Sequence, residues 1–448
     1  MAFDTSVSGI LAASADLGII GNNIANASTV GFKTSRGEFT DIYAASLLGT
    51  PGTSVGQGVK LNSVTQDFSQ GNIQFTSNSL DLAINGPGFF RLSNDGVATY
   101  TRAGAFQLDR EGNIVNSSGM KLQGFPQDRF GNITGELGDL VLSTALIDPQ
   151  ATTQVSISAN LDSREVAPAA AFAALDADGN NTFFDAFANP PTSPDSDMFN
   201  ASSSMTIYDG LGNPHVLSVY FAKRNPGDVE LTEEQIAAGE SVNNRWYAYT
   251  LIDGVQQGEA QEVSFGSDGL LELDPNDPLK NKIQITDWQP LDSNGEPLGA
   301  SAQTFTVDYE SFTQYGTDFS ISSVVQDGYS TGQLRGIEID SSGIMFTRYT
   351  NGQSRTIGQI AIASFTNQNG LQPAGDTTFV ETFSSGQATI TTPGLGGTGL
   401  LSSGALEGSN VELTQQLVNM IVAQRNFQAN AQMIQTEDAV TQSVINLR

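Results

Sequence analysis

Apolar positions recur with a helical spacing at both ends of the chain. At the N-terminus they follow alternating steps of four and three residues along an otherwise small and polar segment without proline. A repeat of this kind predicts a helix with one apolar stripe, similar to the seam of a coiled coil. The apolar positions that we expect to make its contacts are Phe3, Val7, Ile10, Leu17 and Ile24.

The C-terminal segment carries a similar pattern over a longer stretch. Residues 411–447 contain neither glycine nor proline, so one uninterrupted helix is predicted. Its polar face is mostly glutamine and asparagine, and uncharged amides suit close packing because unpaired charges are costly to desolvate. We expect this helix to pack in a coiled coil or an array; the alternative is a plain amphipathic helix docked on its own domain. Its expected apolar contacts are Leu413, Leu417, Met420, Phe427 and Ile434.

Almost everything between the two ends has the pattern of strands and turns. Alternating or apolar runs such as 216–221 and 359–365 lie beside turn signals such as 209–213 and 340–343, in which Asp or Asn precedes Gly. Asp and Asn favour the start of a turn, and Gly supplies a positive φ. The predicted fold is mainly β with terminal α-helices. The chain is expected to be nested and multi-domain, with the N- and C-terminal helices paired as a coiled coil and the β-domains outward.

This nested order divides the chain into layers that it crosses twice, once in each direction. The expected layers are paired terminal helices at 1–30 and 409–448, a linker region at 31–72 and 393–408, an inner β-domain at 73–147 and 314–392, and an acidic outer β-domain at 148–313 in which 167–194 is a candidate excursion.

Charge sharpens the picture of the centre. The 448 residues include 19 Lys and Arg against 48 Asp and Glu, which gives a net charge of −29. Between positions 148 and 310 there are 26 acidic and 6 basic residues, a net charge of −20. A region of this kind is expected to face solvent, where repulsion limits unspecific contact. The same charge argues against nucleic-acid binding, which needs a positive surface.

The composition leaves little room for chemistry. The chain has no Cys and one His, which excludes disulfides, thiolate metal sites and any two-histidine metal site. His215 follows Pro214 at a hairpin and is expected at the edge of a turn. Residues 176–180 resemble part of a calcium loop but lack its bidentate Glu. We predict no catalytic residues, no cofactor, no metal and no enzyme activity.

Targeting signals are also weak. No run of 18 apolar residues occurs, so no membrane insertion is expected. The N-terminus has no basic region followed by an apolar core, so a cleaved signal peptide is not expected.

Three blocks of sequence resemble the bacterial flagellar rod and hook protein family. They are residues 8–13 with 22–33, residues 79–90 with 100–106, and residues 417–431. The first block carries the family motif, which consists of Asn22, Asn23, Asn26, Gly31, Phe32 and Lys33. The large centre, with a hairpin at 207–213, is similar to that of the hook members of the family.

The resemblance implies a structural subunit that self-assembles into a curved tubular polymer. This polymer, the flagellar hook, is the flexible universal joint that transmits torque from rod to filament in swimming. The implied partners are further copies of the chain, the distal rod protein, the hook cap, the hook–filament junction proteins and the flagellar export apparatus. The implied location is the extracellular flagellum, at the hook and basal body.

Two other interpretations stay open at this point. A distal rod protein of the same family would also be structural, but its members are generally shorter. A secreted β-rich adhesin is the less favoured alternative; the aromatic residues Trp246, Tyr247, Tyr249 and Trp288 could serve it, although core packing explains them better.

Overall fold

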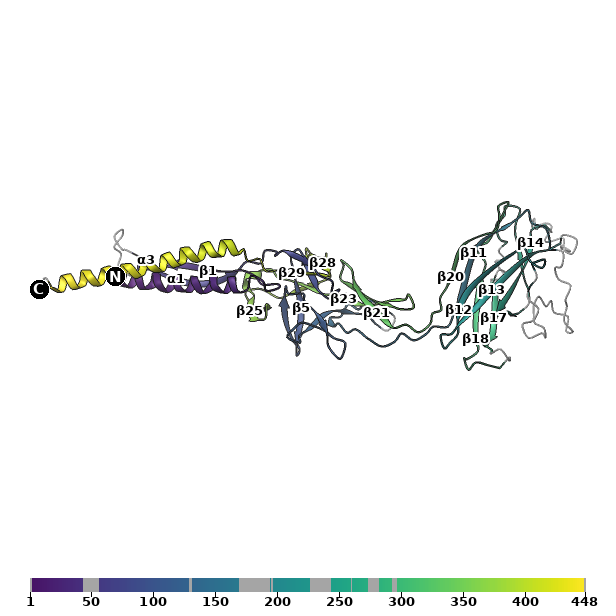
Figure 1. The fold of residues 1–448 in the computed structure, drawn as a ribbon, viewed down its shortest axis with the longest axis horizontal. Coiled ribbons are helices and arrows are strands. Elements are labelled where there is room, and N and C mark those ends of the chain that lie inside the picture. The colour runs from purple at the N-terminus through teal and green to yellow at the C-terminus, as the bar shows by residue number, and fades with distance from the viewer. Residues whose placement is uncertain are drawn as a thin grey trace. The chain divides into compact units, whose positions relative to one another are not determined.

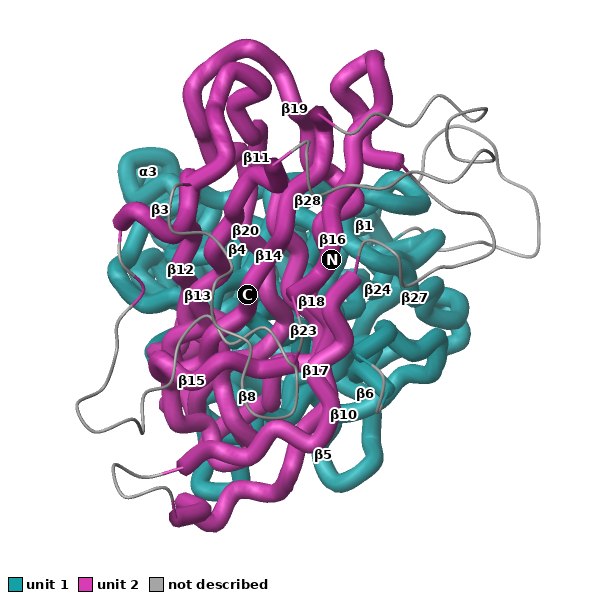
Figure 2. The backbone as a smooth tube through the Cα atoms, turned by 90° about the vertical axis from the view of Figure 1, so that its right-hand side faces the viewer, with its two compact units in different colours: residues 1–144, 335–348, 354–448 teal, residues 145–334, 349–353 magenta. Residues whose placement is uncertain are grey.

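A computed structural model describes residues 2–42, 56–128, 131–168, 194, 196–225, 243–258, 260–272, 282–291 and 296–446. The chain divides into two compact units (Figure 2). Unit 1 comprises Met1–Thr144, Arg335–Arg348 and Ser354–Arg448, and unit 2 comprises Ala145–Leu334 and Tyr349–Gln353. Unit 1 is thus built from both ends of the chain, and unit 2 is inserted into it.

Two helices at the chain ends pack against each other within unit 1 (Figure 1). Helix α1 spans Ala2–Ala25 and helix α3 spans Leu413–Asn446. Beside α1 lies a two-stranded antiparallel ribbon of β1 (Ser35–Asp41) and β2 (Val59–Gln66). The prediction of a mainly β chain whose terminal helices pair is confirmed.

The β-part of unit 1 has one large sheet and two small strand pairs. The strands of the large sheet are β5 (Phe89–Asn94), β6 (Val97–Thr101), β7 (Gln107–Leu108), β8 (Ile114–Val115), β9 (Lys121–Pro126), β10 (Gly138–Asp139), β21 (Leu334–Ile339), β22 (Ile344–Tyr349), β23 (Ser354–Ile360), β24 (Ile362–Ser364), β25 (Gln372–Gly375), β26 (Thr378–Val380) and β27 (Thr389–Thr391). A 3-10 turn, η2 (Gln368–Gly370), precedes β25.

The two small pairs join distant parts of the sequence. Strand β3 (Ile73–Phe75) pairs with β29 (Ala405–Glu407), and β4 (Leu82–Asn85) pairs with β28 (Leu400–Ser403). The segment 393–408, expected as a linker, therefore contributes one strand to each pair, and the segment 31–72 contains the β1–β2 ribbon. The core beneath them draws on both ends of the chain, since Leu82 and Ile84 share one buried cluster with Leu401.

Unit 2 is a sandwich of two five-stranded sheets. One sheet contains β11 (Gln154–Asp162), β17 (Lys282–Trp288), β18 (Gln303–Asp308), β19 (Thr313–Tyr315) and β20 (Ser320–Gln326), and the other contains β12 (Ala201–Tyr208), β13 (Pro214–Lys223), β14 (Arg245–Ile252), β15 (Val255–Gln256) and β16 (Gln261–Ser264). Trp246 and Trp288 are buried in the core between them, which supports the packing interpretation of these aromatics.

The boundary of unit 2 differs from the one expected from charge. Strands β19 and β20 lie beyond position 313, yet both pair with β11 of unit 2. Strand β20 carries no charged residue, so the shift in charge density ends before the fold does. The candidate excursion at 167–194 and the calcium-like residues 176–180 lie almost wholly outside the described residues.

A repeated turn motif explains several hairpins. In the motif Asp-x-x-Gly-Asn, Asp109 Oδ1 accepts the backbone N–H of Asn113 at 2.7 Å, and Asp209 Oδ1 accepts that of Asn213 at 2.7 Å. Gly212 has φ +84°, a backbone conformation that residues other than glycine rarely adopt. The turn signals read from the sequence therefore form through side-chain hydrogen bonds within the motif.

Candidate assembly site

The helices α1 and α3 run antiparallel in a fixed register. Near one end of the pair, Asn23 Nδ2 donates to Gln416 Oε1 at 3.4 Å. Further along, a Cβ added at Gly9 would lie 2.5 Å from Asn430 Oδ1. Asn23 and Gly9 are as many residues apart as Gln416 and Asn430, so one register holds over the whole contact. We call α1 and α3 together the helical pair.

The contact inside the helical pair is made mostly by small and polar residues. On α1, Ser6, Ala13 and Ile20 are buried at intervals of seven residues, and on α3 Gln416 and Ala423 are buried at the same interval. A seven-residue repeat keeps one seam facing the partner helix. Small side chains on this seam let the two backbones approach closely.

The apolar residues expected to make the helix contacts lie mainly outside this seam. Phe3, Leu413, Leu417 and Phe427 are exposed, and Val7, Ile10, Leu17, Ile24, Met420 and Ile434 are half-buried. Other large apolar side chains of the pair are exposed as well, including Leu11, Val418, Ile421, Val422, Met433, Val440 and Ile445. We call the exposed large apolar residues of α1 and α3 the outer apolar set: Phe3, Leu11, Leu413, Leu417, Val418, Ile421, Val422, Phe427, Met433, Val440 and Ile445. The role of these residues in assembly stays a prediction.

Helix α1 is long and apolar enough to meet the length and hydropathy criteria for a membrane-spanning helix. By length and composition alone Phe3–Ala25 could cross a bilayer, with a mean hydropathy of 1.3 over its best window. The sequence did not predict this, because small and polar residues interrupt the apolar positions of the segment. Although α1 packs along α3 and the β1–β2 ribbon, Phe3 and Leu11 on this helix stay exposed.

The family motif begins at the end of α1. Asn23 is buried and binds the backbone of Ser35 twice, donating through Nδ2 at 2.8 Å and accepting through Oδ1 at 2.9 Å. Asn26 Nδ2 donates to the carbonyl of the exposed Asn22 at 3.0 Å and, through Oδ1, accepts the Thr29 hydroxyl at 3.1 Å. These amides end the helix and fix the direction in which the chain leaves it.

The rest of the motif enters the β-part of unit 1. Gly31 has φ +69°, and a Cβ there would lie 2.4 Å from the backbone nitrogen of Ala103. Phe32 is half-buried and Lys33 is buried. Glycine is needed at position 31 because both the backbone conformation and the space exclude a side chain.

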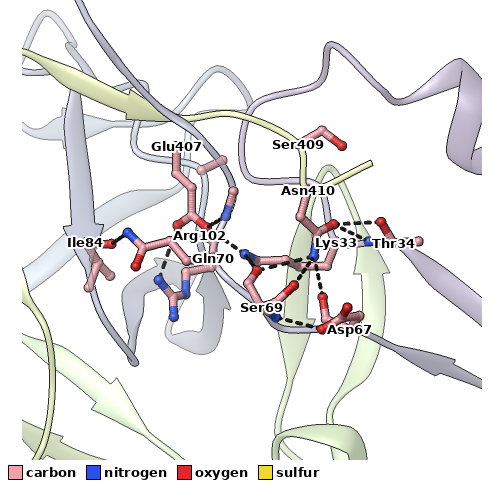
Figure 3. Close-up of polar contacts among 12 residues, drawn as sticks. Lys33, Thr34, Asp67, Ser69, Gln70, Ile84, Arg102, Glu407, Ser409 and Asn410 are labelled. Carbon is pink, nitrogen blue, oxygen red and sulfur yellow. Dashed lines mark hydrogen bonds and ion pairs between the residues drawn. The ribbon is translucent and has the colours of Figure 1, made fainter. Parts of the chain in front are cut away.

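Lys33 belongs to a buried ionic cluster that joins three segments (Figure 3). Glu407 accepts from Lys33 Nζ at 2.6 Å, from Arg102 Nη1 at 3.2 Å and from the backbone N–H of Gly71 at 2.9 Å. Lys33 Nζ also donates to the Ser69 carbonyl at 2.7 Å. The side chains of Lys33 and Glu407 have no exposed surface. We call these residues the junction.

The electrostatics of the junction are unbalanced, with two cations against one carboxylate. Burial lowers the pKa of Lys33, and Glu407 partly restores it. Burial likewise lowers the pKa of Arg102 against the same opposing effect of Glu407. Breaking a buried ion pair by removing one partner is strongly destabilising. Glu407 is therefore the residue on which the junction depends.

Asn410 extends the junction to the start of α3. Its Oδ1 accepts the N–H of Thr34 at 2.7 Å, and its Nδ2 donates to the carbonyls of Asp67 at 2.8 Å and Ser69 at 3.2 Å (Figure 3). The segment that follows α1 and the segment that leads into α3 are thus tied to the same loop. Sequence reasoning identified Lys33 but not Arg102, Glu407 or Asn410. One signal was available, since Glu407 is the only charged residue between positions 382 and 411.

The single histidine of the chain lies in unit 2 and faces two carboxylates. His215 is buried in unit 2, with Nδ1 2.6 Å from Asp253 Oδ2 and Nε2 3.5 Å from Asp209 Oδ2. Among the described residues, no group of three or more His, Cys, Asp or Glu side chains could hold a metal ion.

Family models cover the chain in order. The model for flagella basal body rod proteins matches residues 3–33, and the flagellar hook protein FlgE/F/G D1 domain matches 83–160. The flagellar basal body protein FlaE D2 domain matches 160–329, and the flagellar basal body rod FlgEFG protein C-terminal model matches 402–447. Paired terminal helices around inserted β-units, with these matches, define an axial protein of the bacterial flagellum.

Full-length relatives narrow the family. The chain is 34% identical to the flagellar hook protein FlgE of Salmonella typhimurium and 35% identical to that of Escherichia coli, over 100% of each chain. The crystal structure of Helicobacter pylori flagellar hook protein FlgE2 shares the fold, with a TM-score of 0.50 at 15% identity over 75% of this chain and 100% of that one. The chain belongs to the flagellar hook protein family and is a structural subunit of the hook.

Proposed function

We propose that the outer apolar set of the helical pair carries the polymerisation of this hook subunit. A hook protein polymerises and attaches to the rod, so it needs a surface that neighbouring copies can cover. Leu417 is 47% exposed and Phe427 is 38% exposed. Full burial of such a side chain stabilises a contact by about 1.5–3 kcal/mol, so even partial burial of several on each subunit adds substantially. This exposed stripe is the observation that carries the proposal.

The polar composition of α3 fits the same role. Within Leu413–Asn446 the only charged residues are Arg425, Glu437 and Asp438. A solvent-exposed helix usually carries more pairs of opposite charges between successive turns. Amide side chains can be desolvated against a neighbouring helix at lower cost, because they still find hydrogen-bond partners there.

We further propose that the two units divide the mechanical work. Packed helical pairs carry torsional load from subunit to subunit. The acidic unit 2 makes weaker contacts with its neighbours, because like charges repel and the surface is polar. A tube with a firm helical wall and weakly attached β-units can transmit torque and still bend.

The proposal extends to partners and location. The polymer of this chain joins the distal rod protein, the hook cap and the hook–filament junction proteins. The subunit leaves the cell through the flagellar export apparatus without a cleaved signal peptide. Its role is structural and needs no catalysis or cofactor. A distal rod function is not favoured, because the full-length relatives are hook proteins.

The test introduces charge into the outer apolar set. Leu417→Asp and Phe427→Asp should each prevent polymerisation of the purified chain, measured by sedimentation and electron microscopy. Leu211→Asp is the control, since Leu211 is also exposed but lies in unit 2. Unit 2 should stay folded in all three variants, as reported by the fluorescence of its two tryptophans. Normal polymers from the Leu417 and Phe427 variants would refute the proposal.

A further inference from the structure

Phe383 is displayed in solvent on a tightly held turn of unit 1. Its relative exposure is 104%, so no described residue covers the ring. The Thr382 hydroxyl beside it donates to the Gly370 carbonyl at 2.6 Å. The same oxygen accepts the backbone N–H groups of Ser384 at 3.1 Å and Ser385 at 3.3 Å. The backbone on both sides of the ring is therefore fixed.

Further hydrogen bonds anchor the turn from below. Ser385 is fully buried, and its hydroxyl accepts the N–H of Thr382 and donates to the Thr382 carbonyl, both at 2.9 Å. Asn367 Nδ2 donates to the Ser384 carbonyl at 3.0 Å. An aromatic ring held ready on a rigid turn loses little entropy on binding, which is typical of an interface anchor.

The same unit contains a hollow that fits an aromatic ring. A cavity of about 570 Å³ lies between the end of α1 and the hairpin of β25 and β26. Phe32, Pro373 and Phe379 are among its apolar lining residues, and Asn22, Asn26 and Thr377 are among its polar ones. The size lies in the range of pockets that bury small ligands.

The rim of this cavity has an unusual backbone. Asp376 and Thr377 have φ +48° and +56°, although neither is glycine. They form the two-residue turn between β25 and β26, and this kind of hairpin turn needs a positive φ at both positions, so the edge of the cavity has a defined backbone shape.

We propose that the Phe383 ring of one subunit enters the cavity of a neighbouring copy of this chain. This inference rests on the proposed polymerisation and names one of its contacts. A ring that enters a cavity lined by other residues can make a heterologous contact, the kind that generates an open helical polymer when it does not close into a ring of subunits. The cavity includes Asn22 and Asn26, so it adjoins the helical pair whose outer apolar set is proposed to be buried.

The chemistry of the two partners agrees with this occupant. Residues 382–388 around the ring carry no charge. The lining has two charged residues: Lys33 is paired with Glu407, and Asp376 accepts the hydroxyl of Ser118 at 2.8 Å. Both charged residues of the lining therefore already have a partner within the subunit, and the ring brings no further charge into the cavity.

The first test removes the ring. Phe383→Ala should leave the melting temperature of the monomer unchanged, because the ring contacts no described residue. It should raise the critical concentration for polymerisation by about tenfold or more, the equivalent of losing one buried aromatic side chain. Phe383→Tyr, which keeps the ring, should polymerise nearly as the parent chain does. Equal polymerisation of the alanine variant and the parent would overturn the proposal.

The second test uses the absence of native cysteine. Subunits carrying Phe383→Cys are mixed with subunits carrying Thr377→Cys, copolymerised at high concentration and oxidised. Cross-linked dimers between the two should appear on a non-reducing gel. The control replaces Phe383→Cys with Val97→Cys, since Val97 is also well exposed in unit 1. Copolymers that form without the cross-link, or that cross-link equally in the control, overturn this contact but not polymerisation. Failure of the parent chain to polymerise overturns both.

Discussion

Replacement of Glu407 by glutamine should lower the stability of unit 1, so that unit 1 unfolds at a lower temperature than it does in the parent chain. Glu407 accepts three hydrogen bonds, two from buried cations, and its own side chain has no exposed surface. The amide keeps the shape but removes the carboxylate that pairs with both Lys33 and Arg102. Removing one partner of a buried ion pair costs about 3–5 kcal/mol. For a unit of this size the melting temperature should fall by about 6–20 °C.

The assay can separate the two units of the chain. Both tryptophans, Trp246 and Trp288, lie in unit 2, so their fluorescence reports unit 2 alone. Unit 1 is followed by hydrogen exchange at the amides of β4 and β28. Glu407→Gln should make those amides exchange faster, and it should leave the unfolding transition of unit 2, followed by tryptophan fluorescence, unchanged.

A matched control lies in the same unit. Glu338 pairs with Arg348, but both side chains are more than half exposed. An exposed ion pair is worth about 0–1 kcal/mol, so Glu338→Gln should change little. Equal effects of the Glu407 and Glu338 variants would refute the reasoning about the junction.

The deficit of the Glu407 variant should also depend on pH. Burial lowers the pKa of Lys33, and without Glu407 it falls further. A lysine with a lowered folded pKa binds fewer protons than the unfolded chain, so stability rises with pH below the unfolded value of 10.5. The difference between variant and parent should therefore shrink between neutral pH and pH 10. A constant difference would show that Lys33 is not the group that carries the cost.

Three further outcomes follow from the described contacts. Gly9→Leu should disrupt the helical pair by pressing on Asn430, whereas Gly18→Leu, where nothing lies within 4 Å, should not; circular dichroism and polymerisation measure both. Burial raises the pKa of Asp327, but hydrogen bonds from Thr153 and Gln154 outweigh it and hold this pKa below its usual value. The ionised Asp327 therefore stabilises unit 2 above pH 3.8, and this stabilisation is lost as the pH falls through the folded pKa. Asp327→Asn should weaken the loss of stability in acid, measured by tryptophan fluorescence. Asn23→Ala leaves two backbone groups of a buried contact without partners and should cost about 1–3 kcal/mol in unit 1, measured by denaturant unfolding.

Periodicity predicted which segments are helical but not what their apolar stripe contacts. The regular spacing of Leu413, Leu417 and Phe427 predicted a contact stripe, yet these residues are exposed in the single chain and their role in assembly stays a prediction. A hydrophobic repeat is the same whether its partner is the same chain or another copy. The seam actually used, with Ala13 and Ala423, repeats every seven residues too, but small residues give a weak hydrophobic signal.

The junction could be predicted only in part. Lys33 belongs to a recognisable motif, but its partner Glu407 lies 374 residues away in the sequence. No local rule connects two such positions. The isolated charge at Glu407 in a long neutral segment is a signal that it is buried with a partner, although it does not say which partner.

The way unit 1 closes determines the order in which the protein can fold. Strands β28 and β29 arrive near the end of the chain and pair with β4 and β3 near its beginning. Unit 2, inserted between them, has its own core and can form first, whereas the distant pairings of unit 1 are slow to form and depend on the last segment. A chain cut before position 400 would lack α3 and one side of both strand pairs. An incomplete chain lacks α3 and cannot form the helical pair, so the fold itself would keep incomplete subunits out of the polymer.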